Sequence, residues 1–227
     1  MRISPTSLDH VALWVEERDP LADFLCRYLS MHVIEQTDSF TLVGVDAKLG
    51  KVTLFDAKGP RERGALEQLT LRVQDLDAAA EGLPPEARAR HEDGVVTFDA
   101  PQGLRMGLVP GDGPDYDLDH VVLRVPEPAA SARALTGLGF ERRDGTVAVA
   151  DRHVRLEPGG RPEGERPLLN HLALLVDSAS ETQGEAERAG IEIAEVKDAA
   201  NTLAVFVWGP DRIKLEYVEH KPGFALI

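Results

Sequence analysis

The 227-residue sequence contains a single cysteine, Cys26, so no disulfide bond can form within the chain. This usage fits a reducing compartment, and we expect a cytoplasmic protein. No apolar run approaches the roughly 18 residues of a spanning helix, and the first residues lack the apolar core of a signal peptide. We therefore expect neither a membrane anchor nor export.

Basic residues are also few: 25 Lys and Arg face 39 Asp and Glu, which gives a net charge of −14. An acidic surface disfavours nucleic acids, whose phosphates require cations, and it disfavours anionic membranes. No glycine-rich segment runs from a strand into a Gly-x-Gly-x-x-Gly helix start, which disfavours a dinucleotide site. The hydrophobic content of 43% is near the globular average and predicts a folded core.

The sequence does contain a fourfold repeat. Similar eight-residue stretches occur at residues 8–15, 66–73, 118–125 and 169–176. Each alternates with a period of two, which is typical of a strand with one apolar face. The third position of each stretch lies on the other face and holds His10, Gln68, His120 or His171. The steps between these positions are 58, 52 and 51 residues, and a period of about 50 indicates a repeated supersecondary unit.

Each of these strands is followed by a helical pattern and then by further strand patterns: three in the first, third and fourth units, but only two, at residues 95–98 and 104–109, in the second unit. The sequence therefore predicts an α+β protein of four βαβββ units with mixed sheets. The strongest breaker in the chain is the Pro- and Gly-rich stretch at residues 110–115. We place a boundary there, which predicts an N-terminal pair of units in 1–110 and a C-terminal pair in 115–227.

Carboxylates in the last strands of the units are the second candidate feature. In the fourth unit, alternation directs Glu216 away from the apolar face and toward the same space as His171. The same reasoning predicts that Glu157 shares a cleft with His120. The second half of the chain thus offers two imidazoles and two carboxylates on converging surfaces.

The first half offers fewer donors. The positions that match Glu216 hold Phe55 in the first unit and Gly107 in the second, and neither residue can bind a metal. His10 and Gln68 remain, and we interpret them as a degenerate site. The second half is therefore the predicted location of the metal.

Two imidazoles with one or two carboxylates suit Fe²⁺, Mn²⁺, Co²⁺, Ni²⁺ or Zn²⁺. Three protein ligands would form a facial triad that leaves positions open for substrate and O₂. Four ligands would leave about two positions, enough to chelate and polarise a substrate through adjacent oxygens.

The Asp-His and Asn-His dipeptides in the first strands resemble those of the vicinal oxygen chelate superfamily. The stretch Gly-Pro-Asp-Arg-Ile-Lys-Leu-Glu-Tyr at 209–217 is similar to its Asp-Pro-Asp-Gly-Asn-x-Ile-Glu-Leu pattern. The superfamily includes glyoxalase I, extradiol dioxygenases, methylmalonyl-CoA epimerase and bleomycin-resistance proteins. The resemblance implies two glyoxalase-like domains whose mixed sheets curl around a cleft.

Four units with a degenerate first half are similar to the extradiol ring-cleaving dioxygenases. This resemblance implies that Fe²⁺ is held by His120, His171 and Glu216, with Ni²⁺, Co²⁺, Mn²⁺ or Zn²⁺ as alternatives. It also implies a small-molecule substrate with adjacent oxygens, and a homodimer as a further level of assembly.

The chain also departs from that pattern. Phe206 stands where the dioxygenases usually carry a tyrosine, and Glu157 adds a carboxylate that they normally lack. A His-Glu-His-Glu set is what glyoxalase-type lyases and epimerases use, with Glu157 then acting as ligand or catalytic base. A metal-free binding protein of the bleomycin-resistance kind is the third hypothesis. All three remain open at the level of sequence.

Overall fold

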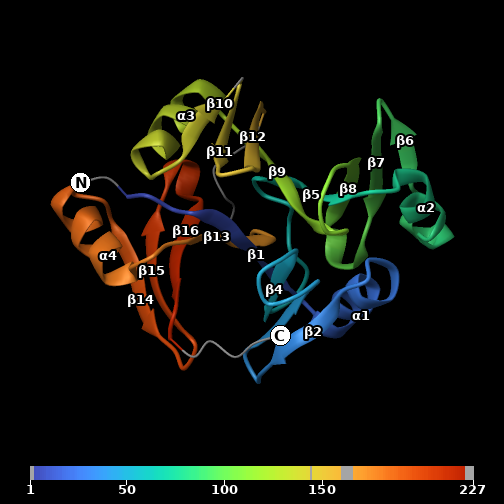
Figure 1. Cartoon of the computed structure of the whole chain (residues 1–227), viewed down its shortest axis with the longest axis horizontal. Helices are drawn as coiled ribbons and strands as arrows, with labels where there is room; N and C mark the ends of the chain where they lie inside the picture. The colour runs from blue at the N-terminus through green and yellow to red at the C-terminus, as the bar shows by residue number, and fades with distance from the viewer. Residues whose placement is uncertain (1–2, 144, 160–165, 223–227) are drawn as a thin grey trace.

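The structure is a computed structural model that describes residues 3–143, 145–159 and 166–222, and in them the predicted repeat is present four times (Figure 1). Unit 1 consists of β1 (Ser7–Val15), α1 (Arg18–Tyr28), β2 (His32–Gln36), β3 (Phe40–Gly44) and β4 (Lys51–Asp56). Unit 2 consists of β5 (Leu66–Val73), α2 (Leu76–Glu81), η1 (Pro85–Ala87), β6 (Arg90–Glu92), β7 (Val95–Asp99), η2 (Pro101–Gly103) and β8 (Arg105–Pro110).

The second half of the chain has the same order of elements. Unit 3 consists of β9 (Asp117–Val125), α3 (Pro128–Gly137), β10 (Glu141–Arg143), β11 (Thr146–Val149) and β12 (Arg152–Pro158). Unit 4 consists of β13 (Leu169–Leu175), α4 (Ala179–Arg188), β14 (Ile193–Asp198), β15 (Thr202–Trp208), η3 (Pro210–Arg212) and β16 (Lys214–His220). No helix in the described residues is long and apolar enough to cross a membrane.

The alternation predicted for the first strands explains how each unit packs. In β1 the side chains of Val11, Leu13 and Val15 are fully buried, and α1 covers this face of the sheet with Leu21 and Leu25. Within every unit the first strand pairs in parallel with the last strand, and the two middle strands continue outward to the edge. Parallel pairing is the reason that a helix must connect the first strand to the rest of the unit.

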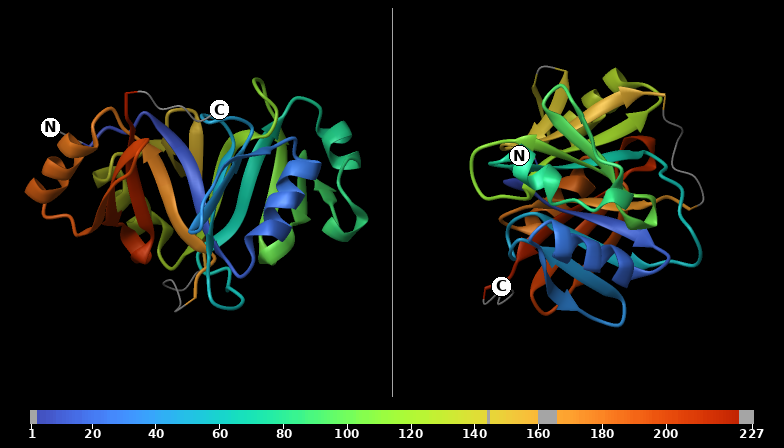
Figure 2. Two further views of the ribbon diagram at one scale, coloured as in Figure 1. Left: turned by 90° about the horizontal axis from the view of Figure 1, so that it is seen from below. Right: turned by 90° about the vertical axis from the view of Figure 1, so that its right-hand side faces the viewer.

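The units join in an order that the sequence did not indicate. β1 pairs antiparallel with β13, and β5 pairs antiparallel with β9. The first sheet therefore has the order β14-β15-β16-β13-β1-β4-β3-β2, and the second has the order β10-β11-β12-β9-β5-β8-β7-β6. In Figures 1 and 2, α3 and α4 lie at one end of the molecule and α1 and α2 at the other, with the two sheets running between them.

The expected α+β class and two mixed sheets are thus present, but the predicted pairing of neighbouring units is wrong. Unit 1 pairs with unit 4, and unit 2 pairs with unit 3. The boundary expected at residues 110–115 falls between β8 and β9, which belong to the same sheet. The four first strands have nearly the same apolar pattern, so that pattern does not decide which of them become neighbours.

Buried polar contacts join the two sheets beside the first strand. The Arg152 guanidinium on β12 donates to both carboxylate oxygens of Asp117 at 3.0 and 2.9 Å. It also donates to the Leu8 carbonyl oxygen of β1 at 2.9 Å and contacts the Ser7 hydroxyl. Asp117 in turn accepts the Gly50 N–H at 2.9 Å. These contacts fix the start of β1, where the candidate site begins.

Candidate metal centre

A β-bulge in β1 and another in β13 orient the side chains of the candidate site. The register between β1 and β13 shifts between Leu8 and His10, which leaves Asp9 as an extra residue, and Asn170 is skipped in the same way before His171. A bulge re-aims side chains, so neighbouring residues that would point to opposite faces can come together. The Asp9 carboxylate accordingly reaches His10 Nδ1 at 2.9 Å, and Asn170 Oδ1 reaches His171 Nδ1 at 3.0 Å.

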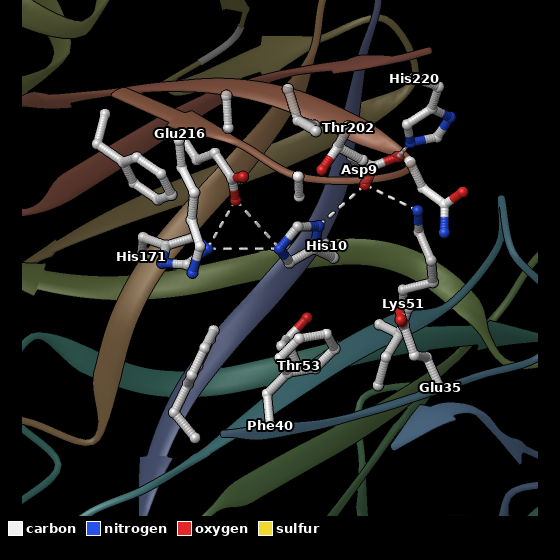
Figure 3. A pocket seen from close by; sticks show the side chains of 18 of the residues that line it. Asp9, His10, Glu35, Phe40, Lys51, Thr53, His171, Thr202, Glu216 and His220 are labelled. Atoms are coloured by element: carbon white, nitrogen blue, oxygen red, sulfur yellow. Dashed lines mark hydrogen bonds and ion pairs between the residues drawn. The ribbon is translucent and has the colours of Figure 1, made fainter. Parts of the chain in front are cut away.

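Three donor atoms converge on one point of the first sheet (Figure 3). His171 Nε2 lies 2.8 Å from Glu216 Oε2, and His10 Nε2 lies 3.3 Å from the same oxygen. The two Nε2 atoms are 3.4 Å apart. His10 comes from β1, His171 from β13 and Glu216 from β16, so units 1 and 4 build the cluster together.

The hydrogen bonds at Nδ1 decide what the Nε2 atoms present to the cluster. When Nδ1–H donates to Asp9 or Asn170, a neutral imidazole has a lone pair at Nε2. Two such lone pairs and a carboxylate oxygen at 2.8–3.4 Å repel one another unless a cation lies between them. The arrangement therefore calls for a proton or a metal ion at its centre.

The spacing fits a metal ion. Ligand bonds of about 2.0–2.2 Å place two donors of one ion about 2.8 to 3.6 Å apart, for angles between a right angle and tetrahedral. All three separations in the cluster fall in this range. Two imidazoles whose other nitrogens are hydrogen-bonded, together with one carboxylate, are a donor set that divalent transition metals prefer.

The ionisable groups of the site shift one another's pKa values. Burial alone would lower the pKa of His10, but hydrogen bonds to Asp9 and Glu216 outweigh it and raise that pKa to about 9. Burial lowers the pKa of His171, although Glu216 opposes this effect. Burial would raise the pKa of Glu216, yet the two imidazoles hold it well below its usual range. The cluster thus keeps its carboxylate ionised and is suited to bind a cation.

Small side chains surround the cluster on the sheet. Ala173 lies between His10 and Glu216 in register, and Ala12 lies between His171 and Thr53. Both alanines are fully buried, so their methyl groups form a floor between the donors. Thr53, and not Phe55 as the sequence predicted, occupies in unit 1 the register position that Glu216 has in unit 4. The fourth position of the twofold arrangement is therefore held by a hydroxyl group and not by a carboxylate.

A cavity of about 210 Å³ opens above this floor. Its walls come from units 1 and 4, and its aromatic part consists of Phe40, Phe55 and Phe206. The ring centroid of Phe206 lies 5.2 Å from that of His171 in an edge-to-face arrangement, and Phe55 lies 6.2 Å from it. The candidate metal centre thus lies at one end of an aromatic-lined cavity.

Polar side chains form the opposite flank of the cavity. Lys51 Nζ donates to Asp9 Oδ2 at 2.8 Å, and His220 Nε2 lies 3.6 Å from Asp9 Oδ1. Asp9 and Lys51 are both buried. Burial would raise the pKa of Asp9, but Lys51, His10 and His220 hold that pKa well below its usual range. The carboxylate therefore stays ionised beside His10.

The structure brings together two of the three predicted metal ligands, His171 and Glu216, and supplies His10 in place of His120. His120 lies on β9 of the second sheet and is not part of the cluster. Its Nδ1 is 2.6 Å from Asp119 Oδ1, which repeats the bulge geometry of His10, but its buried Nε2 has no hydrogen-bond partner in the part of the chain that the structure describes. Placing His120 in the triad was the consequence of pairing the wrong units.

Glu157 does not reach a cleft with His120. In unit 3 the register sets Arg155 opposite Val122, which is the place that Glu216 takes opposite Ala173. Glu157 lies two residues further along, with its side chain 38% exposed and its carboxylate 3.8 Å from an Arg155 nitrogen. A shift of two residues keeps the face but moves the side chain along the strand, so alternation could not detect it.

The second sheet holds no comparable donor cluster among the described residues. Gln68 Nε2 donates to Thr70 Oγ1 at 2.8 Å, and a Cβ atom on Gly107 would lie only 2.4 Å from that amide nitrogen. Gly107 and Gln68 thus fill the space that a ligand pair would require. The degenerate site predicted at His10 and Gln68 is split, because Gln68 lies in this sheet and His10 in the other.

His10, Asp9 and Lys51 were not assigned to the metal site from the sequence. The Asp-His dipeptide at residues 9–10 is the same as the one at 119–120, so both histidines had an equal claim. Lys51 was visible as a charged residue at the start of strand β4, where it is followed by the apolar residues Val52, Leu54 and Phe55. A lysine is rarely buried without an acidic partner. The partner of Lys51 in the structure is the Asp9 carboxylate.

No protein-family model matches the sequence, and no curated protein sequence matches it. The fold is shared with solved structures. A presumed dioxygenase from Bacillus subtilis subsp. subtilis str. 168 superposes with a TM-score of 0.78 at 18% identity, over 98% of this chain and 87% of that chain. Glyoxalase I from Zea mays superposes with a TM-score of 0.76 at 16% identity, over 94% and 92%. The chain has the vicinal oxygen chelate fold that the sequence motifs led us to expect.

Proposed function

We propose that the protein is a metal-dependent oxygenase that binds one divalent ion, Fe²⁺ by preference, through His10, His171 and Glu216. Its substrate would be a small ring with adjacent hydroxyl groups, cleaved with O₂. The observation that carries the proposal is the convergence of two imidazoles and one carboxylate at the end of an aromatic-lined cavity.

The number of donors supports an oxygenase over a lyase. Two histidines and one carboxylate on one side of an ion leave open positions, as in the non-haem iron oxygenases. Thr53 takes the place where a fourth ligand, a second carboxylate, would stand, and Glu157 lies in the other sheet. When bound, the ion would hold the adjacent oxygens of the substrate and lower the barrier to its reaction with O₂.

The size of the cavity supports a single ring. A cavity of about 150 Å³ lined by apolar side chains accommodates benzene, and one water-sized group takes up about 30 Å³. The present cavity of about 210 Å³ therefore has room for a benzene ring with two hydroxyl groups. Phe40, Phe55 and Phe206 would hold the ring and exclude water, and His220 offers an imidazole on the polar flank that can accept a proton.

A glyoxalase-type lyase or an epimerase is the second candidate function. The shared fold with maize glyoxalase I is compatible with it, and His220 places an imidazole that can accept a proton in the cavity. Such an enzyme would move a proton next to a metal-polarised carbonyl group and would not consume O₂. A metal-free binding protein is the third candidate, and metal retention separates it from the first two.

The test begins with purified protein that is loaded with Fe²⁺ without oxygen and then mixed with O₂ and catechol or a single-ring derivative. We expect O₂ uptake together with loss of the ring absorbance. The His10→Ala variant should lose bound metal and activity. His120→Ala is the matched control, because the same Asp-His bulge in the second sheet should leave both unchanged.

Each other outcome has a definite meaning. Metal binding without O₂ uptake, combined with activity on a thiohemiacetal or an acyl-CoA, would favour the lyase or epimerase. Protein that remains metal-free in Fe²⁺, Ni²⁺ and Zn²⁺ would favour the binding protein. Loss of metal in His120→Ala but not in His10→Ala would refute the assignment of the ligands.

A further inference from the structure

Lys51 is the buried lysine of the described chain, with 4% of its surface exposed. Its alkyl stem passes against Gly44, where an added Cβ atom would lie 3.0 Å from Lys51 Cγ. Because Gly44 does not have a positive φ, its lack of a side chain serves space and not backbone conformation. The sheet thus leaves room for the lysine to reach Asp9.

Stability alone does not account for this ion pair. Removing an ammonium group and a carboxylate from water costs several kcal/mol for each ion, and apolar side chains of similar volume are often as stable or more so. Asp9 and Lys51 are nevertheless both buried, with 2.8 Å between Oδ2 and Nζ. The position of the pair beside a donor cluster indicates a functional role.

The two imidazoles of the cluster are held by different partners. His171 donates to the neutral amide oxygen of Asn170 at 3.0 Å. His10 donates to the Asp9 carboxylate at 2.9 Å, and Lys51 binds the same oxygen, Oδ2. Lys51, Asp9 and His10 therefore form a continuous contact chain from β4 to the cluster, and His171 has no charged equivalent at its Nδ1.

We propose that Lys51 is a positioning residue that acts through Asp9 to hold His10 with Nδ1 protonated and Nε2 directed at the metal. The proposal rests on the proposed metal-binding function. A carboxylate partner fixes the orientation of a ligating imidazole and increases its basicity. Lys51 tethers that carboxylate, so His10 becomes the more strongly donating of the two histidines.

The first test replaces the ammonium group by an apolar group of similar length in Lys51→Met. Equilibrium dialysis with Zn²⁺ should show an affinity loss of about 10- to 100-fold, the usual effect of losing such an outer partner. Lys48→Met makes the same chemical change at an exposed lysine of the nearby turn and should bind Zn²⁺ as the unaltered protein does. Circular dichroism verifies that both variants are folded.

A second readout follows the imidazoles directly. Above the pKa of His10, where its imidazole carries a single proton, nitrogen-15 NMR of the histidine rings distinguishes an Nδ1–H from an Nε2–H form. In Lys51→Met we expect the His10 ring signals to change and those of His171 to remain. A lysine that only stabilised the sheet would leave both rings in their original forms.

The third variant, Asp9→Asn, gives His10 the neutral partner that His171 already has. It should weaken Zn²⁺ binding, and adding Lys51→Met to it should cause little further loss, because the lysine acts through the carboxylate. Additive losses, or a folded Lys51→Met with unaltered affinity and His10 signals, would overturn the proposal. If the unaltered protein binds no Zn²⁺, Co²⁺ or Fe²⁺, the proposed function fails, and the NMR comparison in metal-free protein still decides the role of Lys51.

Discussion

A single side chain, Thr53, separates a three-donor from a four-donor arrangement. It stands in unit 1 where Glu216 stands in unit 4, beside the buried floor residue Ala12. We predict that Thr53→Glu adds a fourth ligand, which tightens metal binding and removes O₂ uptake because an open position is filled. Dialysis and an oxygen electrode measure the two effects. The control is Thr53→Ser, and O₂ uptake in Thr53→Glu at the original rate would contradict the three-donor interpretation.

The single cysteine allows a clean prediction of pH dependence. Burial, with a contribution from Asp23, raises the pKa of the Cys26 thiol above its ordinary value. A raised pKa leaves less thiolate at any given pH, and the thiolate is the reactive form. The rate of reaction with a thiol reagent should therefore be low at neutral pH and reach half its maximum at higher pH than for a free cysteine peptide. A midpoint at or below that of the peptide would refute the prediction.

At this scale the sequence predicted the kinds of residue better than their grouping. His171 and Glu216 come together because alternation and unit equivalence determine the face of each strand. The prediction that Glu157 shares a cleft with His120 was wrong, because a shift by two positions along β12 leaves the face of the strand unchanged. His10 was assigned to the degenerate half because Phe55 and Gly107 were matched to Glu216 there, and its Asp-His dipeptide, which is identical to that of His120, gave no reason to prefer it. Both errors concern distances along and between strands, which a pattern with a period of two does not contain.

At the scale of the elements, the contact between β12 and β1 should dominate stability. Arg152→Met would leave the Asp117 carboxylate buried without its partner, and loss of one member of such a pair costs about 3–5 kcal/mol. We predict this decrease in the free energy of unfolding, measured in urea.

A matched change at an exposed pair provides the control. Arg143 Nη2 lies 3.1 Å from Glu141 Oε2, and both side chains are largely exposed. Arg143→Met should cost at most about 1 kcal/mol, because solvent screens such pairs. Equal stability of Arg152→Met and Arg143→Met would show that the buried pair does not hold the sheets together.

The elements themselves were predictable from local rules. Every unit has the strand, helix and three strands of the repeat, although β6 of unit 2 was not expected from its periodicity. Asp75 and Ser178 cap α2 and α4 by accepting the Ala78 and Glu181 N–H groups, as short polar side chains do at helix starts. The bulges before His10, His120 and His171 were not predictable, because an extra residue is defined only by the strand that lies opposite.

For the whole molecule, the pairing of the first unit with the last leads to a fragment experiment. Residues 1–110 contain β1 without β13, and residues 115–227 contain β13 without β1. We predict that neither fragment alone retains metal and that co-expression of the two restores binding. In a control, the chain is divided after residue 58, which leaves units 2 and 3 in one fragment. This control measures the effect of dividing the chain without separating units 2 and 3. Tight metal binding by fragment 115–227 alone would contradict the assignment to units 1 and 4.

The arrangement of the first sheet also has a consequence for folding during synthesis. β1 is synthesised well before its neighbour β13, because His10 and His171 are 161 residues apart. Units 2 and 3 are consecutive, so their sheet can assemble while unit 4 is still being synthesised. During that interval β1 has an unpaired edge, which is a template for aggregation. The nascent chain therefore exposes this edge of β1 until unit 4 has been synthesised.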